Sequence, residues 1–262
     1  EIVGSMLSSC FGAQNVYIIN QIAAHAEGAR SVDRNVDTIF EIGGQDAKYI
    51  RLSEGRIVDA AMNEACSAGT GSFIEEQGRK FREAQSLTDL SDLALSADHG
   101  VSLGQHCSVF MAQVIEEAIA SGVSTPEILA GIYDSVVLNY FYRVKGNRSV
   151  GHTVFCQGMP FQSPALAAAV VRQTQAEVII PPNPGNIGAF GIARLARKAI
   201  HNISPCNLND FLAAKLSSRH TFICASNKGC GGSGNKCRID KIVVDLDGKK
   251  LQFTWGGACS LW

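Results

Sequence analysis

The sequence predicts an α/β fold that is followed by a small cysteine-rich module. Short apolar stretches of strand character alternate with amphipathic helical stretches, and glycine-containing turns separate them. Beyond His201 the character changes, because five cysteines cluster around a glycine-rich loop at 229–234. We therefore expect three parts, at 1–36, 37–200 and 201–262.

The bulk composition indicates a sizeable apolar core and little net charge. The chain has 262 residues, of which 46% are hydrophobic, with a formal charge of -1. Such a balance gives no reason to expect a nucleic acid or an anionic membrane as partner. The stretch before Ser31 lacks the features of a signal peptide, and no apolar run approaches the ~20 residues of a membrane span, so we expect a cytoplasmic protein.

The nine cysteines are a high and odd number. Without a secretory signal they favour thiolate chemistry or metal binding over disulfides. Cys10 and Cys156 are expected to be small buried core residues instead.

The chain begins at Glu1, already inside an apolar pattern, and we expect it to be a piece of a longer protein. Apolar residues at helical spacing predict a helix over 16–29, with Gly28 placed to end it. His25 lies on this helix, where a surface histidine is the simpler interpretation than a catalyst.

The stretch 37–52 is interpreted as two strands joined by a tight Gly43–Gly44 turn, and a second hairpin follows at Glu54–Gly55. Glycines at a strand end let backbone amides approach an anion closely. Asp46 beside such a turn could hold Mg²⁺ through water or, with Gln45, orient an attacking water. The alternative is an ordinary hairpin turn with a solvated aspartate.

The next stretch places Cys66 and a Gly69-Thr70-Gly71 loop before a helix that begins near Ser72. A helix start favours the thiolate form of a cysteine, which is the form that binds metal. The glycines also leave amides for a phosphate. A plain loop with a helix N-cap is the alternative.

Cys107 also precedes a helix, which has Ser108 as its expected N-cap and Gly122 at its end. Two separated cysteines do not complete a four-thiolate site. A second copy of the chain could supply the missing pair, because a two-fold axis through the site would give four ligands from two sequence positions.

Two further glycine-rich stretches follow a predicted core helix that extends from Thr125 to about Val144. The first reads as strand, glycine turn and helix, with Gln157 and Gly158 at the turn, and could form a wall of a nucleotide site. The second is a proline-rich turn that contains Asn186, followed by a helix of small residues suited to close packing.

The C-terminal module has cysteines at spacings that suit a metal or cluster, although free structural thiols explain them as well. Strands at 241–246 and 250–255 form a predicted hairpin that carries Cys259 back toward the others. The candidate ligands are Cys224, Cys230, Cys237 and Cys259.

Four motifs resemble those of the BadF/BadG/BcrA/BcrD ATPase family, which includes activators of 2-hydroxyglutaryl-CoA dehydratase and subunits of benzoyl-CoA reductase. They are Glu41-Ile-Gly-Gly-Gln-Asp-Ala-Lys, Glu64-Ala-Cys-Ser-Ala-Gly-Thr-Gly-Ser-Phe, His152 to Gly158, and Pro181-Pro-Asn-Pro-Gly-Asn-Ile-Gly-Ala-Phe-Gly. The resemblance covers roughly 15–200.

The resemblance implies the fold shared by actin, acetate kinase and Hsp70, a ribonuclease H-like architecture of two lobes that close on ATP and Mg²⁺. It implies an activator in which a [4Fe-4S] cluster bridges a homodimer and ATP hydrolysis to ADP drives a low-potential electron to the partner. That partner is a 2-hydroxyacyl-CoA dehydratase or a benzoyl-CoA reductase-like component, and ferredoxin or flavodoxin is the implied donor.

Residue by residue, the two cluster cysteines of the family correspond to Cys66 and Cys107. The second phosphate motif corresponds to Gly43–Asp46, and the adenosine motif includes Gln157 and Gly158. His25 falls in a His-Ala-Arg-Gly stretch of the family, which reads His-Ala-Glu-Gly in this chain.

One family element is missing from this sequence. The first phosphate loop, of Asp-x-Gly-Ser-Thr type, is not found, and Gly4–Ser5 lies too late to supply it. The first lobe is therefore expected to be truncated, and the chain alone is expected to bind nucleotide weakly and to hydrolyse little. A small-molecule kinase of the same fold and a non-catalytic assembly module are the alternative functions.

Overall fold

A computed structural model describes residues 19–63, 68–199, 215–228, 234–246 and 248–256. The chain separates into two compact units, one of residues 19–197 and one that combines 1–18 with 198–262. Each is described by itself. No helix within the described ranges has both the length and the apolar character that crossing a bilayer requires.

The larger unit is built on a five-stranded mixed sheet in the order β3-β2-β1-β4-β5. The strands β1 to β3 form an antiparallel meander, whereas β4 pairs in parallel with both β1 and β5. Their bounds are β1 Thr38–Ile42, β2 Ala47–Ser53, β3 Arg56–Met62, β4 Thr153–Gln157 and β5 Glu177–Ile179.

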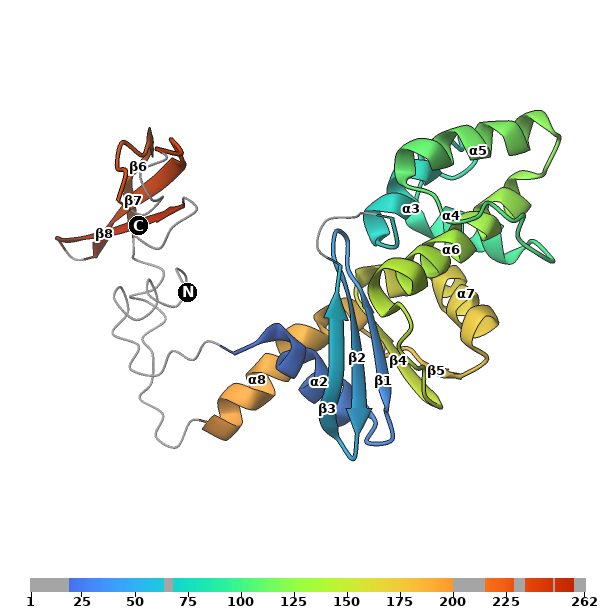
Figure 1. Cartoon of the computed structure of the whole chain (residues 1–262), viewed down its shortest axis with the longest axis horizontal. Coiled ribbons are helices and arrows are strands. Elements are labelled where there is room, and N and C mark those ends of the chain that lie inside the picture. Colours follow the sequence, from blue (N-terminus) through green and yellow to red (C-terminus); the bar gives the residue numbers. More distant parts are fainter. Residues whose placement is uncertain (1–18, 64–67, 200–214, 229–233, 247, 257–262) are drawn as a thin grey trace. The chain divides into compact units, whose positions relative to one another are not determined.

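Helices cover both faces of this sheet, as Figure 1 shows, with α2 and α8 on one face and α3 to α7 on the other. The described helices are α2 Gln21–Val32, α3 Gly71–Gly78, α4 Leu87–Leu95, α5 Ser108–Ala120, α6 Thr125–Tyr140, α7 Pro164–Thr174 and α8 Ile187–Ala199. Short turns of other helical type lie at η1 Phe141–Lys145, η2 Met159–Gln162 and η3 Pro184–Asn186.

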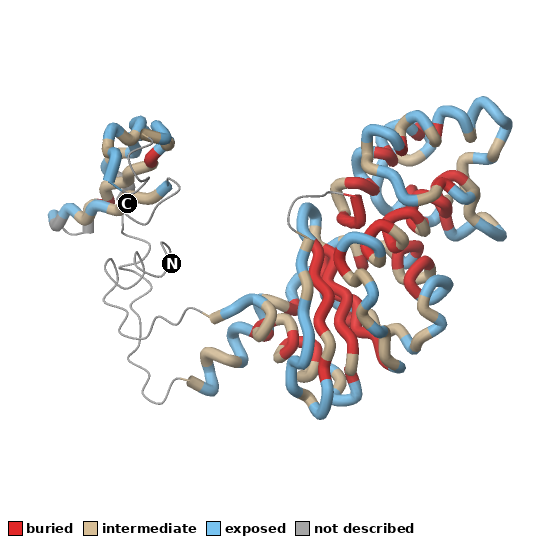
Figure 2. Tube along the Cα trace, viewed as in Figure 1, coloured by how far each residue is buried: buried red, intermediate tan, exposed pale blue. Residues whose placement is uncertain are grey.

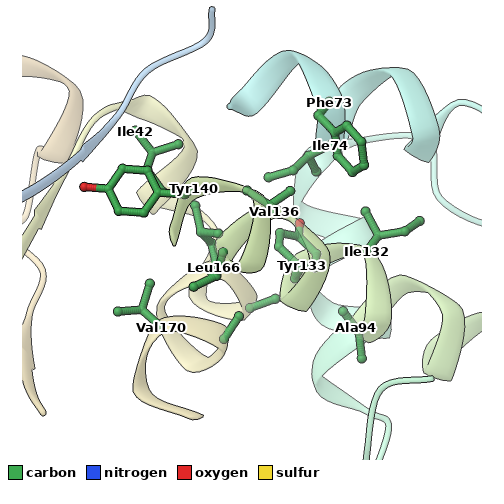
Figure 3. Packing of buried hydrophobic residues seen from close by; sticks show 14 of the residues in the cluster. Ile42, Phe73, Ile74, Ala94, Ile132, Tyr133, Val136, Tyr140, Leu166 and Val170 are labelled. Carbon is green, nitrogen blue, oxygen red and sulfur yellow. The ribbon is translucent and has the colours of Figure 1, made fainter. Parts of the chain in front are cut away.

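The inner strands are buried on both sides, as is typical of mainly apolar strands in the middle of a sheet. Every residue of β1 and of β4 is buried, whereas the edge strand β3 is mostly exposed (Figure 2). The larger core cluster lies around α6, whose Ile132, Tyr133, Val136 and Tyr140 pack among α3, α4 and α7 (Figure 3).

On the opposite face, α2 and α8 cross at very short range because the crossing is lined by glycines. A Cβ atom on Gly191 would overlap the carbonyl oxygen of Ala24, and one on Gly28 would lie 2.5 Å from the carbonyl oxygen of Ile187. Gly28 was expected to end its helix, which was wrong: α2 continues to Val32, and this glycine instead permits the close approach.

The smaller unit contains a three-stranded antiparallel sheet in the order β6-β7-β8. The expected hairpin is confirmed as β7 and β8, and β6 is a strand that the sequence patterns did not indicate. The bounds are β6 Lys215–Ile223, β7 Arg238–Leu246 and β8 Lys249–Gly256.

Candidate functional site

The Gly43–Asp46 turn joins β1 to β2 and is fixed against the start of α3. The amide of Gly43 donates to the carbonyl oxygen of Asp46 at 2.8 Å, which closes the turn. The amides of Gly71 and Ser72 donate to the carbonyl oxygens of Gly43 and Gly44, at 2.9 and 2.8 Å. The first turn of α3 is therefore bound to the turn between the strands.

This docking decides which amides remain for an anion. The amides of Gly71 and Ser72 are hydrogen-bonded to the turn and are not left for a phosphate. The glycines of the Gly69–Gly71 loop therefore contribute by letting neighbouring segments approach the backbone closely. The amides of Gly44 and Gln45 have no acceptor within the described part of the chain. Since both residues are exposed, their amides are the ones that could bind a phosphate oxygen.

Gly158 lies beside this turn because β1 and β4 are parallel neighbours whose carboxyl ends meet at one edge. Its φ is +109°, and a Cβ atom there would overlap the carbonyl oxygen of Ile42. Its amide donates to the carbonyl oxygen of Pro184 at 2.8 Å, which brings η3 to the same edge. Gln157 is fully buried, and both polar atoms of its side chain lack a hydrogen-bond partner among the described residues.

A cavity of about 570 Å³ opens at this edge, between the turn, α3, α4 and the start of α7. Its volume is in the range of small-molecule and cofactor sites. The lining residues are Gly44, Gln45, Gly71, Ser72, Ile74, Glu75, Leu87, Thr88, Ser91, Asp92, Tyr133, Met159, Pro160, Gln162, Ser163 and Pro164.

The candidate nucleotide residues are distributed in and around this cavity. Of the set expected from sequence, Gly44, Gln45 and Gly71 line it. Thr70 is buried beside the α3 start, where its hydroxyl lies 3.1 Å from that of Ser72. The others that are placed near it are Gly43, Gly69, Gln157 and Gly158, whereas Asn186 is exposed in η3.

Several polar lining residues were missed by sequence reasoning, notably Glu75, Thr88, Asp92 and Ser163. Two of them, Thr88 and Asp92, belong to α4, a helix that the sequence analysis did not predict. The sequence signal that could have predicted this helix was the capping box of Ser86 and Asp89. In it, each side chain accepts a hydrogen bond from the backbone amide of the other residue.

Cys107 is the N-cap residue of α5, one position before the expected cap, and it is partly exposed and forms no disulfide. Its neighbours Val109 and Phe110 are 75% and 65% exposed, which is unusual for large apolar side chains on a first helical turn. Cys66 lies outside the described residues. Within the described residues, no group of three or more metal-binding side chains could hold an ion.

In the smaller unit, Cys224 and Cys237 lie at the end of the β6–β7 ladder, where the amide of Cys224 donates to the carbonyl oxygen of Cys237 at 2.8 Å. The amide of Ser226 lies 3.4 Å from the Cys224 sulfur and donates to it. Cys230 and Cys259, the other expected ligands, lie outside the described residues.

His25 lies close to the charged side chains of Lys48 and Asp46, on the face of the sheet that α2 and α8 cover. Burial together with the positive charge of Lys48 lowers the pKa of His25 to about 4. The imidazole is therefore neutral at physiological pH, and its Nδ1 is buried without a partner among the described residues. Gly188 of α8 packs directly against this ring.

Lowering the pH from 7.5 to 5 is expected to remove about 1–2 kcal/mol of folding stability through His25. The unfolded imidazole titrates near 6.5 and the folded one near 4, so only the unfolded chain takes up this proton in that window. The contribution is complete above pH 6.5 and is lost as the pH falls toward 4. Urea denaturation of the wild type and of His25→Gln measures it, and equal pH dependence in both would contradict the assignment.

The comparisons with known proteins agree with this geometry. The family model described as the BadF/BadG/BcrA/BcrD ATPase family matches residues 7–196. The chain is 32% identical over 185 residues to the activator of lactoyl-CoA dehydratase of Anaerotignum propionicum, covering 69% of each chain. It is 30% identical over 179 residues to the 2-hydroxyisocaproyl-CoA dehydratase activator of Clostridioides difficile, covering 68% of this chain and 66% of that protein.

Among solved structures, component A of the (R)-2-hydroxyglutaryl-CoA dehydratase of Acidaminococcus fermentans superposes with a TM-score of 0.64 at 27% identity, over 69% of each chain. The chain thus spans about two thirds of the length of these relatives. The sheet with helices on both faces is the actin-like ATPase fold. This chain belongs to the BadF/BadG/BcrA/BcrD ATPase family.

Proposed function

We propose that this chain is part of an ATP-dependent activator that passes a low-potential electron to a 2-hydroxyacyl-CoA dehydratase or a benzoyl-CoA reductase-like component. The observation that carries the proposal is the position of α3. Its first residues are hydrogen-bonded to the Gly43–Asp46 turn. Near its other end, the side-chain amide of Gln77 donates to the carbonyl oxygen of Ser108 at 3.1 Å. One short helix therefore connects the turn to the residue beside Cys107.

On the nucleotide side, the free amides of Gly44 and Gln45 bind phosphate oxygens of ATP or ADP, and the cavity holds the rest of the nucleotide. Asp46 holds Mg²⁺ through water, and Gln45 orients the water that attacks the terminal phosphate. The remaining nucleotide-binding residues proposed are Gly43, Gly69, Thr70, Gly71, Gln157, Gly158 and Asn186.

On the electron-transfer side, Cys107 and Cys66 from each of two copies are proposed to ligate one [4Fe-4S] cluster. The position of Cys107 fits this role, because it stands at the start of α5 with its side chain partly exposed. The exposed Val109 and Phe110 suit a surface that a second copy covers. A cluster bound there supplies one-electron chemistry, with ferredoxin or flavodoxin as the proposed donor.

The cysteines of the smaller unit are proposed as a second metal site. Its described members, Cys224 and Cys237, are neighbours at the end of one ladder. The amide of Ser226 donates to the Cys224 sulfur. Cys230 and Cys259 are the proposed further ligands.

The proposal is tested by anaerobic purification followed by iron and sulfide analysis, with a parallel titration by Mg·ATP. The expected result is about four iron and four sulfide per dimer, a brown colour, and binding of Mg·ATP to the full-length protein. Nucleotide binding without iron, together with phosphoryl transfer to an acceptor, would favour a kinase. Neither iron nor nucleotide binding would favour an assembly module.

A further inference from the structure

Three charged side chains lie together at the β1–β2 turn. The ammonium group of Lys48 lies 2.8 Å from a carboxylate oxygen of Glu41 and 2.8 Å from one of Asp46. The exposed fractions of the side chains are 3% for Lys48, 8% for Glu41 and 53% for Asp46. A buried lysine therefore joins one buried and one exposed carboxylate.

The two buried members are fixed by the sheet itself. Glu41 and Lys48 are directly opposed in the antiparallel β1–β2 register. Glu41 is also aligned with the buried Gln157 of β4 in the parallel register. Because the strands are held by their ladders on both sides, the position of the ammonium group is set by the central sheet and hardly by the turn.

The surroundings of the lysine strengthen its contacts. Burial alone would favour the neutral amine, but the hydrogen bonds to Asp46 and Glu41 outweigh it and raise the pKa of Lys48. The neutral His25 approaches from α2 and adds no positive charge beside the ammonium group. With little water nearby, the Lys48–Glu41 pair is stronger than a pair on the surface, whereas the carboxylate of Asp46 is half exposed.

The third member, Asp46, lies in the turn, and its half-exposed carboxylate is held by Lys48. One oxygen accepts from Lys48, and the other lies where a Cβ atom on Gly43 would be only 2.9 Å away. Its backbone carbonyl oxygen accepts from the amide of Gly43. The lysine thus connects the rigid sheet to the carboxylate proposed to hold Mg²⁺.

We infer that Lys48, held by Glu41, is a positioning residue that fixes the Asp46 carboxylate and the phosphate-binding turn. The inference rests on the proposed function. With one positive and two negative charges, the group of Lys48, Glu41 and Asp46 is net negative. A negative group attracts Mg²⁺ and repels bare triphosphate.

The test compares Lys48→Met with the wild type in the full-length protein. Without the ammonium group of Lys48, the carboxylate of Asp46 is expected to lose its fixed orientation. We expect kcat for ATP hydrolysis to fall about 10- to 100-fold, with a higher Mg²⁺ requirement and a smaller change in KM. Amide exchange at Gly43, Gly71 and Ser72 is expected to accelerate at least about tenfold, because the turn is no longer held.

Two further variants keep the test sharp if Lys48→Met folds poorly. Glu41→Gln combined with Lys48→Met removes the buried charges on both sides, so it should fold and still show the kinetic and exchange effects. Arg172→Met is the matched control, because it breaks the Arg172–Asp134 ion pair on the helical layer and should change neither.

The exchange measurement separates this inference from the proposed function. Faster exchange at the turn in a protein without ATPase activity would overturn the proposed function and leave the positioning role standing. Unchanged exchange, or a loss of stability with unchanged kcat and Mg²⁺ dependence, would show that Lys48 is merely structural.

Discussion

Substituting serine for Cys107 is expected to remove the bridging iron completely, from about four atoms per dimer to none. A two-fold site draws two of its four ligands from this one position, so each substitution deletes two thiolates at once. Serine keeps the size of the side chain and its place at the start of α5, so the helix should persist. Iron and sulfide analysis under anaerobic conditions measures the loss, and Cys66→Ser should behave alike.

The matched control for this prediction is Cys224→Ser in the smaller unit. It should leave the bridging cluster and its absorbance unchanged, while any metal bound by the C-terminal cysteines falls. Retention of the full iron content by Cys107→Ser would contradict the proposed electron-transfer role and leave a nucleotide-binding fold without a cluster.

Replacing Gly158 by alanine is expected to cost about 3 kcal/mol of folding stability or more. The backbone there has φ of +109° and ψ of +151°, a region essentially restricted to glycine, which costs an L-residue roughly 1–3 kcal/mol. The new methyl group would also overlap the carbonyl oxygen of Ile42, a strand atom that cannot rotate away, which adds roughly 1–3 kcal/mol. Urea denaturation monitored by circular dichroism measures the sum.

Gly122→Ala separates the two terms. Gly122 has φ of +80°, and no atom lies within 4 Å of the position that the new methyl group would take, so only the backbone term applies, at about 1 kcal/mol. If both substitutions cost the same, the close approach of Gly158 to β1 would be refuted. The conclusion that the Gly43–Asp46 turn and the loop at Gly158 meet at one edge of the sheet would then fall as well.

Local patterns predicted the meander and most helices of the larger unit. Both the Gly43–Gly44 and the Glu54–Gly55 turns are where the sequence places them. Positive φ values explain the second turn, at Glu54 and Gly55, whereas neither Gly43 nor Gly44 has a positive φ. The helix that opens at Pro126 was likewise recognisable from its proline and its apolar spacing.

What the sequence could not supply depended on contacts between distant segments. Gly28 reads as a helix end from its neighbours alone, and only the crossing with α8 explains why it lies within α2. The same holds for α4, of which Leu90 and Ala94 are buried in the core whereas Leu87 and Leu95 are exposed. Whether the Gly44 amide is free and that of Gly71 is engaged also depends on the docking of α3 against the turn.

The parallel pairing of β1 with β4 also constrains the order in which the larger unit folds. The β1–β2–β3 meander joins neighbouring segments and can assemble early, at low cost in chain entropy. The other edge of β1 is covered only when β4 pairs with it, which places Thr38 beside Val154. During synthesis, an apolar strand edge therefore remains open until almost the whole unit has left the ribosome, and that interval is when aggregation or chaperone capture competes with folding.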